Sequence, residues 1–454
     1  MKGESTNIDE VTVDREITAN HLAYTNLYMF LVAGDMDSYE HSVLLDRQKC
    51  TGCTTCLQHC PTEAIRIIDR HASIIQDRCI DCGECIRVCT NNAKRAETDK
   101  LDAMNRFKYK IALPAPSLYG QFNNMDDVDY ILNGLIKIGF DEVYEVAKAA
   151  ELVSAYTRKY MKADGIAHPL ISSACPAVLR LISLVYPSLE DHVMHMLPPM
   201  EVAADLARKK AQKEHPELKD EDIGTCFISP CPSKMSYVHN NFGEYKSKVN
   251  AVVAINDVYF RLLDVMKRDA PMENLSETGM NGIIWAESGG ESTAILNEDY
   301  LAADGIENVR RVLEEIENGN IQHVKFVELN ACPGGCVGGV LTVQNPFIAK
   351  TRLRSISRCL PIALNFPDKD EQYIPDNFLF GEMPDYVPMS RLSSNIGESM
   401  RMMADIQRIR ESLPGIDCGA CGAPNCRAHA EDIVRHKVAE VSCPILVARG
   451  ETGK

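Results

Sequence analysis

The sequence has no apolar run long enough to cross a bilayer and no excess of positive charge. Its longest apolar stretch near the N-terminus, residues 27–34, is far shorter than the roughly 20 residues of a membrane helix. The chain opens on polar and acidic residues without the apolar segment of a secretory signal, so we expect a cytoplasmic protein. The net charge of −16 argues against nucleic acid or an anionic membrane surface as the main partner.

What the chain has in excess is cysteine. It carries 18 cysteines in 454 residues of otherwise ordinary globular composition. In a reducing compartment these thiols are expected to be metal ligands, catalytic thiolates or core residues rather than disulfides. Their clustering predicts five segments: an N-terminal segment without a motif (1–43), a two-cluster domain (44–100), a central domain (101–365), an irregular linker rich in proline and aspartate (366–396) and a C-terminal cluster domain (397–454).

The first eight cysteines form a near-repeat of two runs. Each run has the spacing Cys-x2-Cys-x2-Cys-x3-Cys, first from Cys50 to Cys60 and again from Cys79 to Cys89. This is the spacing of bacterial two-cluster ferredoxins, in which the fourth cysteine of each run binds the other cluster. We therefore expect an α+β domain with two 4Fe–4S clusters. Cluster 1 would be held by Cys50, Cys53, Cys56 and Cys89, and cluster 2 by Cys60, Cys79, Cys82 and Cys85. A pair of zinc sites is the alternative.

The last four cysteines follow a different pattern. The chain reads Cys418-Gly-Ala-Cys421-Gly-Ala-Pro-Asn-Cys426 and then Cys443-Pro444, with helices expected at residues 398–412 and 429–441. The pattern resembles the single-cluster domain of corrinoid iron–sulfur proteins and of one component of a membrane electron-transport complex. The resemblance implies a small helical domain with a third 4Fe–4S cluster on Cys418, Cys421, Cys426 and Cys443. A zinc site is the alternative.

Between these groups, strand and helix signals alternate, which predicts an α/β domain with a mostly parallel sheet. Strands are expected at 109–115, 167–172, 224–229, 249–255, 282–286 and 323–329, and helices at 127–138, 175–186, 307–318 and, with a charged face, 201–213. Three strands lead into cysteine-bearing segments, at Cys175, at Cys231 and at Cys332 with Cys336. Because strand ends converge at one edge of a sheet, these four cysteines are expected to hold a further cubane, with Lys234 in reach of an anion beside it.

Over residues 44–365 these motifs resemble the FeFe-hydrogenases, whose catalytic domain has two α/β lobes around an H-cluster. The H-cluster is a cubane joined through a shared cysteine to a two-iron centre with CO, cyanide and a bridging dithiolate amine. The resemblance implies that Cys175, Cys231, Cys332 and Cys336 hold the cubane and that Cys336 is the bridge. It also implies that Lys234 hydrogen-bonds a cyanide ligand, a charge-assisted contact that is strong in a buried site.

The chain departs from the family along the proton route. The family's proton-relaying cysteine is replaced by Ala174, whose methyl group carries no exchangeable proton. The family's upstream carboxylate pair, two methionines and a glutamate are replaced by Thr157 and Tyr160, Ser229 and Asn330, and Tyr237. Only Glu145 and Glu151 are nearby carboxylates. Ser173 is a candidate relay hydroxyl, and His192 and His195 offer another route. Because a positioned acid or base contributes about 10²–10⁴-fold, slow turnover is expected.

The alanine together with a C-terminal cluster domain is similar to the sensory-type FeFe-hydrogenases. This implies slow, reversible oxidation of H2 to protons and electrons, with electrons relayed through the 4Fe–4S clusters to ferredoxin or another redox or signalling protein. Hydrogenase maturation proteins would load the two-iron centre.

Two alternatives stay open: a non-catalytic hydrogenase-like protein of iron–sulfur assembly and a multi-cluster electron carrier. The oligomeric state is also open, with a homodimer as one option. The remaining Cys226 and Cys359 are expected to be buried, inert thiols.

Overall fold

The computed structural model describes residues 40–123, 127–163, 165–240, 245–266, 272–368, 373–383, 388–389, 391–438 and 443–450. The predicted N-terminal segment therefore lies outside the described residues up to Tyr39. None of the helices in the described part of the chain combines the length and the apolarity that a membrane span requires.

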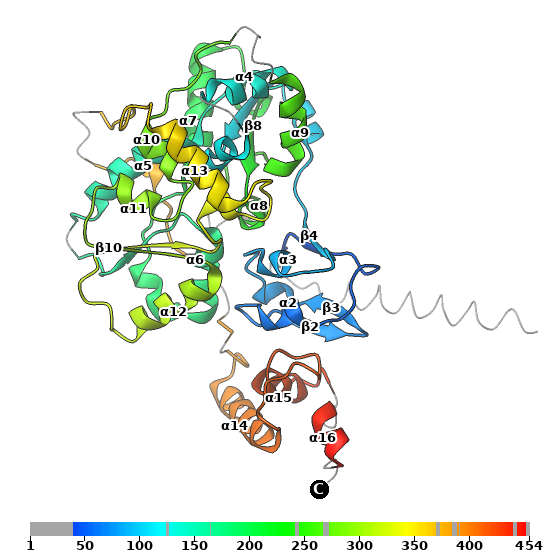
Figure 1. Ribbon diagram of the computed structural model, residues 1–454. Helices are drawn as coiled ribbons and strands as arrows, with labels where there is room; N and C mark the ends of the chain where they lie inside the picture. Colours follow the sequence, from blue (N-terminus) through cyan, green and yellow to red (C-terminus); the bar gives the residue numbers. More distant parts are fainter. Residues whose placement is uncertain are drawn as a thin grey trace, which may run out of the picture. The chain divides into compact units, whose positions relative to one another are not determined.

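The two cysteine runs near the start build two matching halves (Figure 1). In each half a short helix, α2 (Thr55–Gln58) or α3 (Glu84–Arg87), leads into a strand, β2 (Ile65–Ile68) or β4 (Lys94–Ala96). β2 pairs antiparallel with β3 (His71–Ile74), and β4 pairs antiparallel with β1 (Val43–Leu45). Leu57, Ile65 and Ala72 are buried together in a small apolar core. This is the ferredoxin-like α+β fold that the cysteine spacing predicts.

A four-stranded parallel sheet lies at the centre of the first lobe. Its order is β6 (Glu142–Val143), β5 (Tyr109–Pro114), β8 (Ile223–Ser229) and β9 (Ala251–Ala254). All seven residues of β8 are buried, as expected for a central parallel strand with a continuous apolar run.

The second lobe contains a three-stranded parallel sheet of order β10 (Tyr300–Asp304), β11 (Phe326–Asn330) and β7 (Leu170–Ile171). The two-lobed α/β architecture is confirmed.

Two helices begin directly after cysteines of the predicted site. α6 (Pro176–Val185) follows Cys175, and α8 (Pro232–His239) follows Cys231. Proline suits the first helical position because its missing N–H would have no partner there. The other helices of the two lobes are α4 (Asp129–Lys137), α5 (Val146–Tyr160), α7 (Pro199–Glu214), α9 (Ile255–Val265), α10 (Met280–Ile284), α11 (Gly290–Ala294), α12 (Ile306–Glu317) and α13 (Pro346–Ser357).

One predicted strand is wrong. Residues 282–286, expected to form a strand, lie in and directly after helix α10. A Cβ atom on Gly282 would stand only 2.2 Å from the carbonyl oxygen of Ala147 in α5. The apolar run therefore packs helix α10 closely against α5 and does not form a strand.

The charged face expected of the 201–213 helix is partly buried. Glu201 in α7 has no exposed surface and accepts hydrogen bonds from the Tyr245 and Ser247 hydroxyls and from the Lys248 N–H. Hydrogen bonds compensate the burial of this carboxyl group. The segment that supplies these donors is distant in the sequence, so helical periodicity could not reveal the burial.

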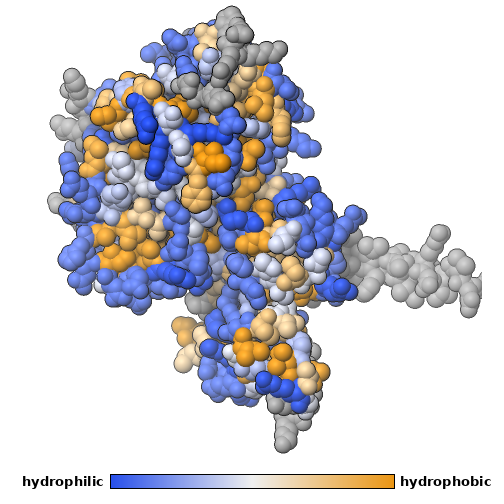
Figure 2. All heavy atoms as spheres, viewed as in Figure 1, coloured by the Kyte–Doolittle hydropathy of each residue, from blue (hydrophilic) through white to orange (hydrophobic). Residues whose placement is uncertain are grey.

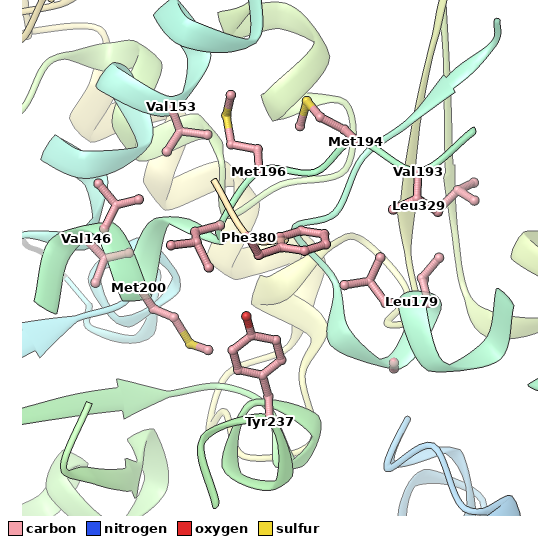
Figure 3. Packing of buried hydrophobic residues seen from close by; sticks show 14 of the residues in the cluster. Val146, Val153, Leu179, Val193, Met194, Met196, Met200, Tyr237, Leu329 and Phe380 are labelled. Carbon is pink, nitrogen blue, oxygen red and sulfur yellow. The ribbon is translucent and has the colours of Figure 1, made fainter. Parts of the chain in front are cut away.

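Part of the expected linker packs into the core of the lobes. Phe378 and Phe380 are 4% and 5% exposed, and Leu379 forms a β-bridge with Met196. Figure 3 shows Phe380 among Met196, Met200 and other apolar side chains of this cluster. The irregular stretch therefore contributes two aromatic side chains to the core before the chain continues to its C-terminal region.

The C-terminal region contains α14 (Ile396–Ser412), α15 (Cys426–Val434) and α16 (Pro444–Arg449). α15 begins three residues before the predicted position, because Asn425 caps it by accepting a hydrogen bond from the Ala428 N–H. It also ends at Val434, earlier than predicted. On α14, Ile396 and Met400 are mostly exposed. Figure 2 shows apolar patches within a largely hydrophilic surface on the face of the molecule in view.

Buried ion pairs join the C-terminal region to the ferredoxin-like region. The Arg66 guanidinium donates two hydrogen bonds to Asp432, at 2.5 and 3.2 Å, and Arg78 pairs with Glu431. These four side chains are at most 13% exposed. The Ile67 N–H donates to the carbonyl oxygen of Gly422 at 2.9 Å. The loops around two predicted cluster sites therefore pack directly against each other.

Asp432→Asn should destabilise the C-terminal region, because it leaves the Arg66 guanidinium buried without its anionic partner. Removal of one member of a buried pair typically costs about 3–5 kcal/mol. Thermal unfolding and limited proteolysis of the full chain would measure the loss. Asp405→Asn is the matched control: its pair with Arg408 is exposed, so it should change the free energy of unfolding by less than about 0.5 kcal/mol. Equal effects of the two variants would contradict a structural role for the buried pair.

Candidate functional site

A cavity of about 60 Å³ lies where strands of both lobes end. Residues that follow β5, β8 and β11 line it, together with residues of α5, α8 and α11. Most of its lining is apolar, and the charged side chains in it are Lys234, Glu291 and Glu328. Two predicted site residues, Ala174 and Cys336, also line it. The convergence of strand ends therefore brings the expected motifs to one place.

Four cysteines come together beside this cavity. Cys231 and Cys332 are buried, and Cys175 and Cys336 are half-buried. Burial raises the pKa of Cys231 to about 11, although the neighbouring Lys234 partly opposes the effect. The pKa values of Cys332 and Cys336 are also raised, by burial and by the other thiolates.

Buried thiolates so close together are costly unless a cation neutralises them. Iron displaces the thiol protons and supplies that charge, so this donor set fits a 4Fe–4S cubane.

Lys234 contributes a cation to the same place. Burial by itself would lower the pKa of Lys234, but Cys336 and Cys231 raise it overall. The residue stands on the first turn of α8, three residues after Cys231. An ammonium group in a mostly apolar cavity is suited to donate to an anionic ligand.

The structure also places the predicted proton-relay candidates. Ala174 lines the cavity, as expected, and offers no ionisable group there. The Ser173 hydroxyl donates to the Met196 carbonyl oxygen at 2.5 Å, and Ser173 is not among the cavity-lining residues. The Ser172 hydroxyl donates instead to Glu291 Oε2 at 2.6 Å.

Glu291 is a functional candidate that the sequence reasoning missed. Its side chain is buried and lines the cavity, and its Oε1 has no hydrogen-bond partner among the described residues. Burial, and next the negative charge of Glu328, raise the pKa of Glu291 to about 8. Burial and the negative charge of Glu328 thus favour the protonated form of this acid, whose Oε1 accepts no hydrogen bond from the described residues. No motif marks it, since it lies on α11, 117 residues from Ala174 in the chain.

The other residues that were singled out as departures from the family pattern fall into two groups, those at the site and those away from the cavity. Asn330 lines the cavity and donates to Glu328, and the Ser229 hydroxyl donates to the Cys231 carbonyl oxygen. Thr157 donates to the Val153 carbonyl oxygen within α5, and the Tyr160 hydroxyl accepts from the His195 N–H. Thr157, Tyr160, Tyr237, Glu145, Glu151, His192 and His195 are not among the cavity-lining residues.

The ferredoxin-like region contains two further cysteine-lined cavities. One is lined by the predicted ligands of cluster 1, Cys50, Cys53, Cys56 and Cys89. The other is lined by those of cluster 2, Cys60, Cys79, Cys82 and Cys85. The backbone N–H groups of Ala64 and Ala93 point at the sulfurs of Cys60 and Cys89, each at 3.2 Å. Such donors stabilise cluster-bound thiolates, so both cavities fit cubanes.

A fourth cavity lies in the C-terminal region and is lined by Cys418, Cys421, Cys426 and Cys443. Of the two remaining cysteines, Cys226 is buried in β8, as expected. The expectation for Cys359 is wrong: it is exposed, because it lies in the turn after α13.

Contacts between loops link the regions around these cavities. The Arg87 guanidinium, on α3, donates to the Gly338 carbonyl oxygen at 3.0 Å, which links the cluster 2 region to the loop of Cys336. At the other end, Gly422 contacts Ile67, which lines the cluster 1 cavity. The cluster 2 region thus adjoins the loop of Cys336, and the cluster 1 cavity adjoins the loop that follows Cys421.

Two α/β lobes around a cavity with a group of four cysteines beside it, and a ferredoxin-like region attached, define an iron–sulfur protein of the hydrogenase fold. The chain belongs to the iron-only hydrogenase large subunit family: residues 108–301 and 272–340 match the model of that family's C-terminal domain. Residues 42–90 match a 4Fe–4S dicluster domain, and residues 413–445 match an Fe–S cluster family.

Individual relatives are distant. Iron hydrogenase 1 of Clostridium pasteurianum is 22% identical over 375 residues, which cover 67% of this chain and 65% of that protein. The chain thus spans slightly less than two thirds of this relative. The periplasmic Fe hydrogenase large subunit of Nitratidesulfovibrio vulgaris is 24% identical over 368 residues, which cover 66% of this chain and 86% of that protein.

The C-terminal region has a relative of its own. One component of the ion-translocating oxidoreductase complex from Methanosarcina acetivorans is 41% identical over 44 residues, or 10% of this chain and 17% of that protein. Among solved structures, an apo FeFe-hydrogenase from Chlamydomonas reinhardtii has a TM-score of 0.48 and 15% identity, covering 64% of this chain and 97% of that chain.

Glu291 should titrate as a buried acid with a midpoint near pH 8. Infrared difference spectra of the full chain should show the carbonyl band of its protonated form disappear as the pH rises through about 8. Glu291→Gln should abolish this step. Glu328→Gln should move it to lower pH, because it removes the neighbouring negative charge.

Glu145 provides the matched control for this titration. Burial raises its pKa only to about 6, and it does not line the cavity. Glu145→Gln should remove an earlier step and leave the step near pH 8 in place. A band that persists unchanged in Glu291→Gln would refute the assignment to Glu291.

Proposed function

We propose that the protein is an FeFe-hydrogenase of the sensory type, which oxidises H2 slowly and reversibly to protons and electrons. The observation that carries the proposal is the cavity in which Lys234 and Cys336 face Ala174 at converging strand ends. An electron carrier has no need of a cation in a cavity beside a cluster.

In this proposal Cys175, Cys231, Cys332 and Cys336 would hold the H-cluster, with Cys336 as the ligand that lines the cavity. The bound H-cluster supplies the reversible cleavage of H2. Lys234 would donate a charge-assisted hydrogen bond to an anionic ligand of that group. The apolar lining of the cavity excludes water and so strengthens that contact.

The proton leaves by a different group from the family's cysteine. Ala174 cannot hold a proton, but Glu291 can hold one on Oε1, its free oxygen in the cavity. The Ser172 hydroxyl holds the other oxygen, Oε2, in place. Because Glu291 is protonated below about pH 8, it is a poor proton acceptor at neutral pH, which agrees with slow turnover.

The cysteines of cluster 2, cluster 1 and the C-terminal site would hold the cubanes of an electron relay, which the contacts of Arg87 with Gly338 and of Ile67 with Gly422 bring next to each other. The partners would be H2, ferredoxin or another redox or signalling protein, and the maturation proteins that load the two-iron centre. The many unpaired cysteines suit a reducing compartment such as the cytoplasm.

A second candidate function is a multi-cluster electron carrier without a two-iron centre. Ala174 favours it, because a carrier needs no proton relay at that position. Infrared spectroscopy separates the two functions. Protein reconstituted with iron and sulfide and then given a synthetic two-iron cofactor should show sharp CO and cyanide bands that shift under H2. Intact cubanes without such bands would favour the carrier.

Ala174→Cys should raise H2 oxidation in the loaded protein, by up to about 10²–10⁴-fold, because it restores a proton-relaying thiol. A gas-uptake assay with an artificial acceptor would measure the increase. Ala150→Cys is the matched control, since Ala150 is buried and lines the same cavity. An equal gain from both variants, or no gain from Ala174→Cys with the infrared bands intact, would contradict proton transfer as the slow step.

A further inference from the structure

The two halves of the ferredoxin-like region are matched in structure but not in charge. The second residue between the first two cysteines of each run has positive φ: Gly52 at 70° in one run and Asp81 at 51° in the other. A second pair of equivalent positions follows the two alanines whose N–H groups point at a cysteine sulfur. Ile65 stands there in one half and Lys94 in the other. Each pair of positions lines a cluster cavity.

Lys94 is placed at the cluster 1 cavity without a hydrogen-bond partner. It is 4% exposed, lines this cavity together with the four cysteines, and its Nζ has no hydrogen-bond partner among the described residues. The corresponding residue at cluster 2 is the apolar Ile65, which is also buried. A buried ammonium group is costly unless an anion offsets it. The thiolates around it supply that anion, since Lys94 opposes the rise in the pKa of Cys56 that burial causes.

Asp81 places the opposite charge at the cluster 2 cavity. It is 1% exposed and lines this cavity, where cluster 1 has only Gly52. Its carboxylate accepts hydrogen bonds from the Ser42 N–H at 3.0 Å and from the Ser236 hydroxyl at 2.6 Å. One carboxylate oxygen is 3.9 Å from the sulfur of Cys79. The carboxylate is thus held beside a cluster 2 ligand.

We propose that Lys94 and Asp81 set the potentials of the two ferredoxin-like clusters apart, with cluster 1 the more easily reduced, so that electrons move from cluster 2 to cluster 1. A cubane with four thiolates is negatively charged and becomes more so on reduction. Its potential therefore depends on nearby charge. A cation at cluster 1 stabilises the added electron, and an anion at cluster 2 opposes it.

This inference rests on the proposed assignment of the two cubanes, and it gives the relay a direction. Cluster 2 is linked to the loop of Cys336, and cluster 1 to the C-terminal site. The charge difference therefore favours movement of each electron away from the catalytic cavity. The charge of Lys94 also opposes the rise in the pKa of Cys85, a predicted ligand of cluster 2, so this lysine influences both clusters.

The test is a redox titration, followed by EPR, of the full chain reconstituted with cubanes only. Lys94→Met should shift one of the more positive reduction potentials to a more negative value. The expected shift is at least about 59 mV, which for one electron is a tenfold change in the partition of electrons between the clusters. Lys94→Arg, which keeps the charge, should leave that reduction potential in place. Lys49→Met is the matched control, since this lysine is exposed and belongs to the same region.

Asp81→Asn provides the independent second test. This variant should shift a second reduction potential, one of the more negative ones, to a more positive value. The double variant should reduce or reverse the difference between the two reduction potentials. Because His41 also lies within 4.8 Å of Asp81 and Cys79, each titration is run at two pH values on either side of the usual histidine range.

The proposal is overturned if Lys94→Met shifts no reduction potential more than Lys49→Met does, or if Lys94→Met and Asp81→Asn act on the same reduction potential. Iron content and visible absorption establish that each variant retains its cubanes. No two-iron centre and no H2 enter the experiment, so the result stands whether or not the protein turns over hydrogen. A chain that binds no cubanes at all would count against the proposed function instead.

Discussion

The central constraint on this structure is the cost of placing many thiolates close together. Sixteen of the 18 cysteines lie in four groups of four, three of them around small cavities and one beside the cavity between the two lobes. Burial raises the pKa of thiols such as Cys85, to about 12, and Cys231. Iron–sulfur clusters remove this cost by replacing the protons. Much of the local backbone, with its tight turns and short helices, serves to bring four sulfurs to one place.

The few charged side chains near these groups then act with unusual strength, because little water screens them. Lys234 lines the cavity between the lobes and Lys94 the cluster 1 cavity, whereas Asp81 lines the cluster 2 cavity. The ion pair of Arg66 and Asp432 holds the C-terminal region against the ferredoxin-like region. The three cysteine-lined sites and the contact of the C-terminal region with the ferredoxin-like region thus share a small set of buried charges.

The cavity between the lobes shows how the folded chain can bring an ionisable group to a place where the local sequence has none. Ala174 deprives the cavity of a thiol, yet Glu291 lines the same cavity and carries a free oxygen. Its neighbour Glu328 makes it harder to ionise. The two carboxyl groups come from α11 and β11, which pack together only in the folded chain.

The sequence alone determined the groups of cysteines, the ferredoxin-like region, the parallel strands and the positions of Ala174 and Lys234, because ligand spacing and apolar periodicity are local properties. It misassigned residues 282–286, whose apolar run packs helix α10 against α5, and it missed the burial of Phe380 and the exposure of Cys359.

Only the tertiary structure decided that Glu291 enters the cavity and that the C-terminal site adjoins cluster 1. It alone showed that Lys94 is buried at the cluster 1 cavity and that Ser42 and Ser236 hold Asp81 at the cluster 2 cavity. The physical reason is that burial and charge pairing arise between segments far apart in the chain, which no local pattern records.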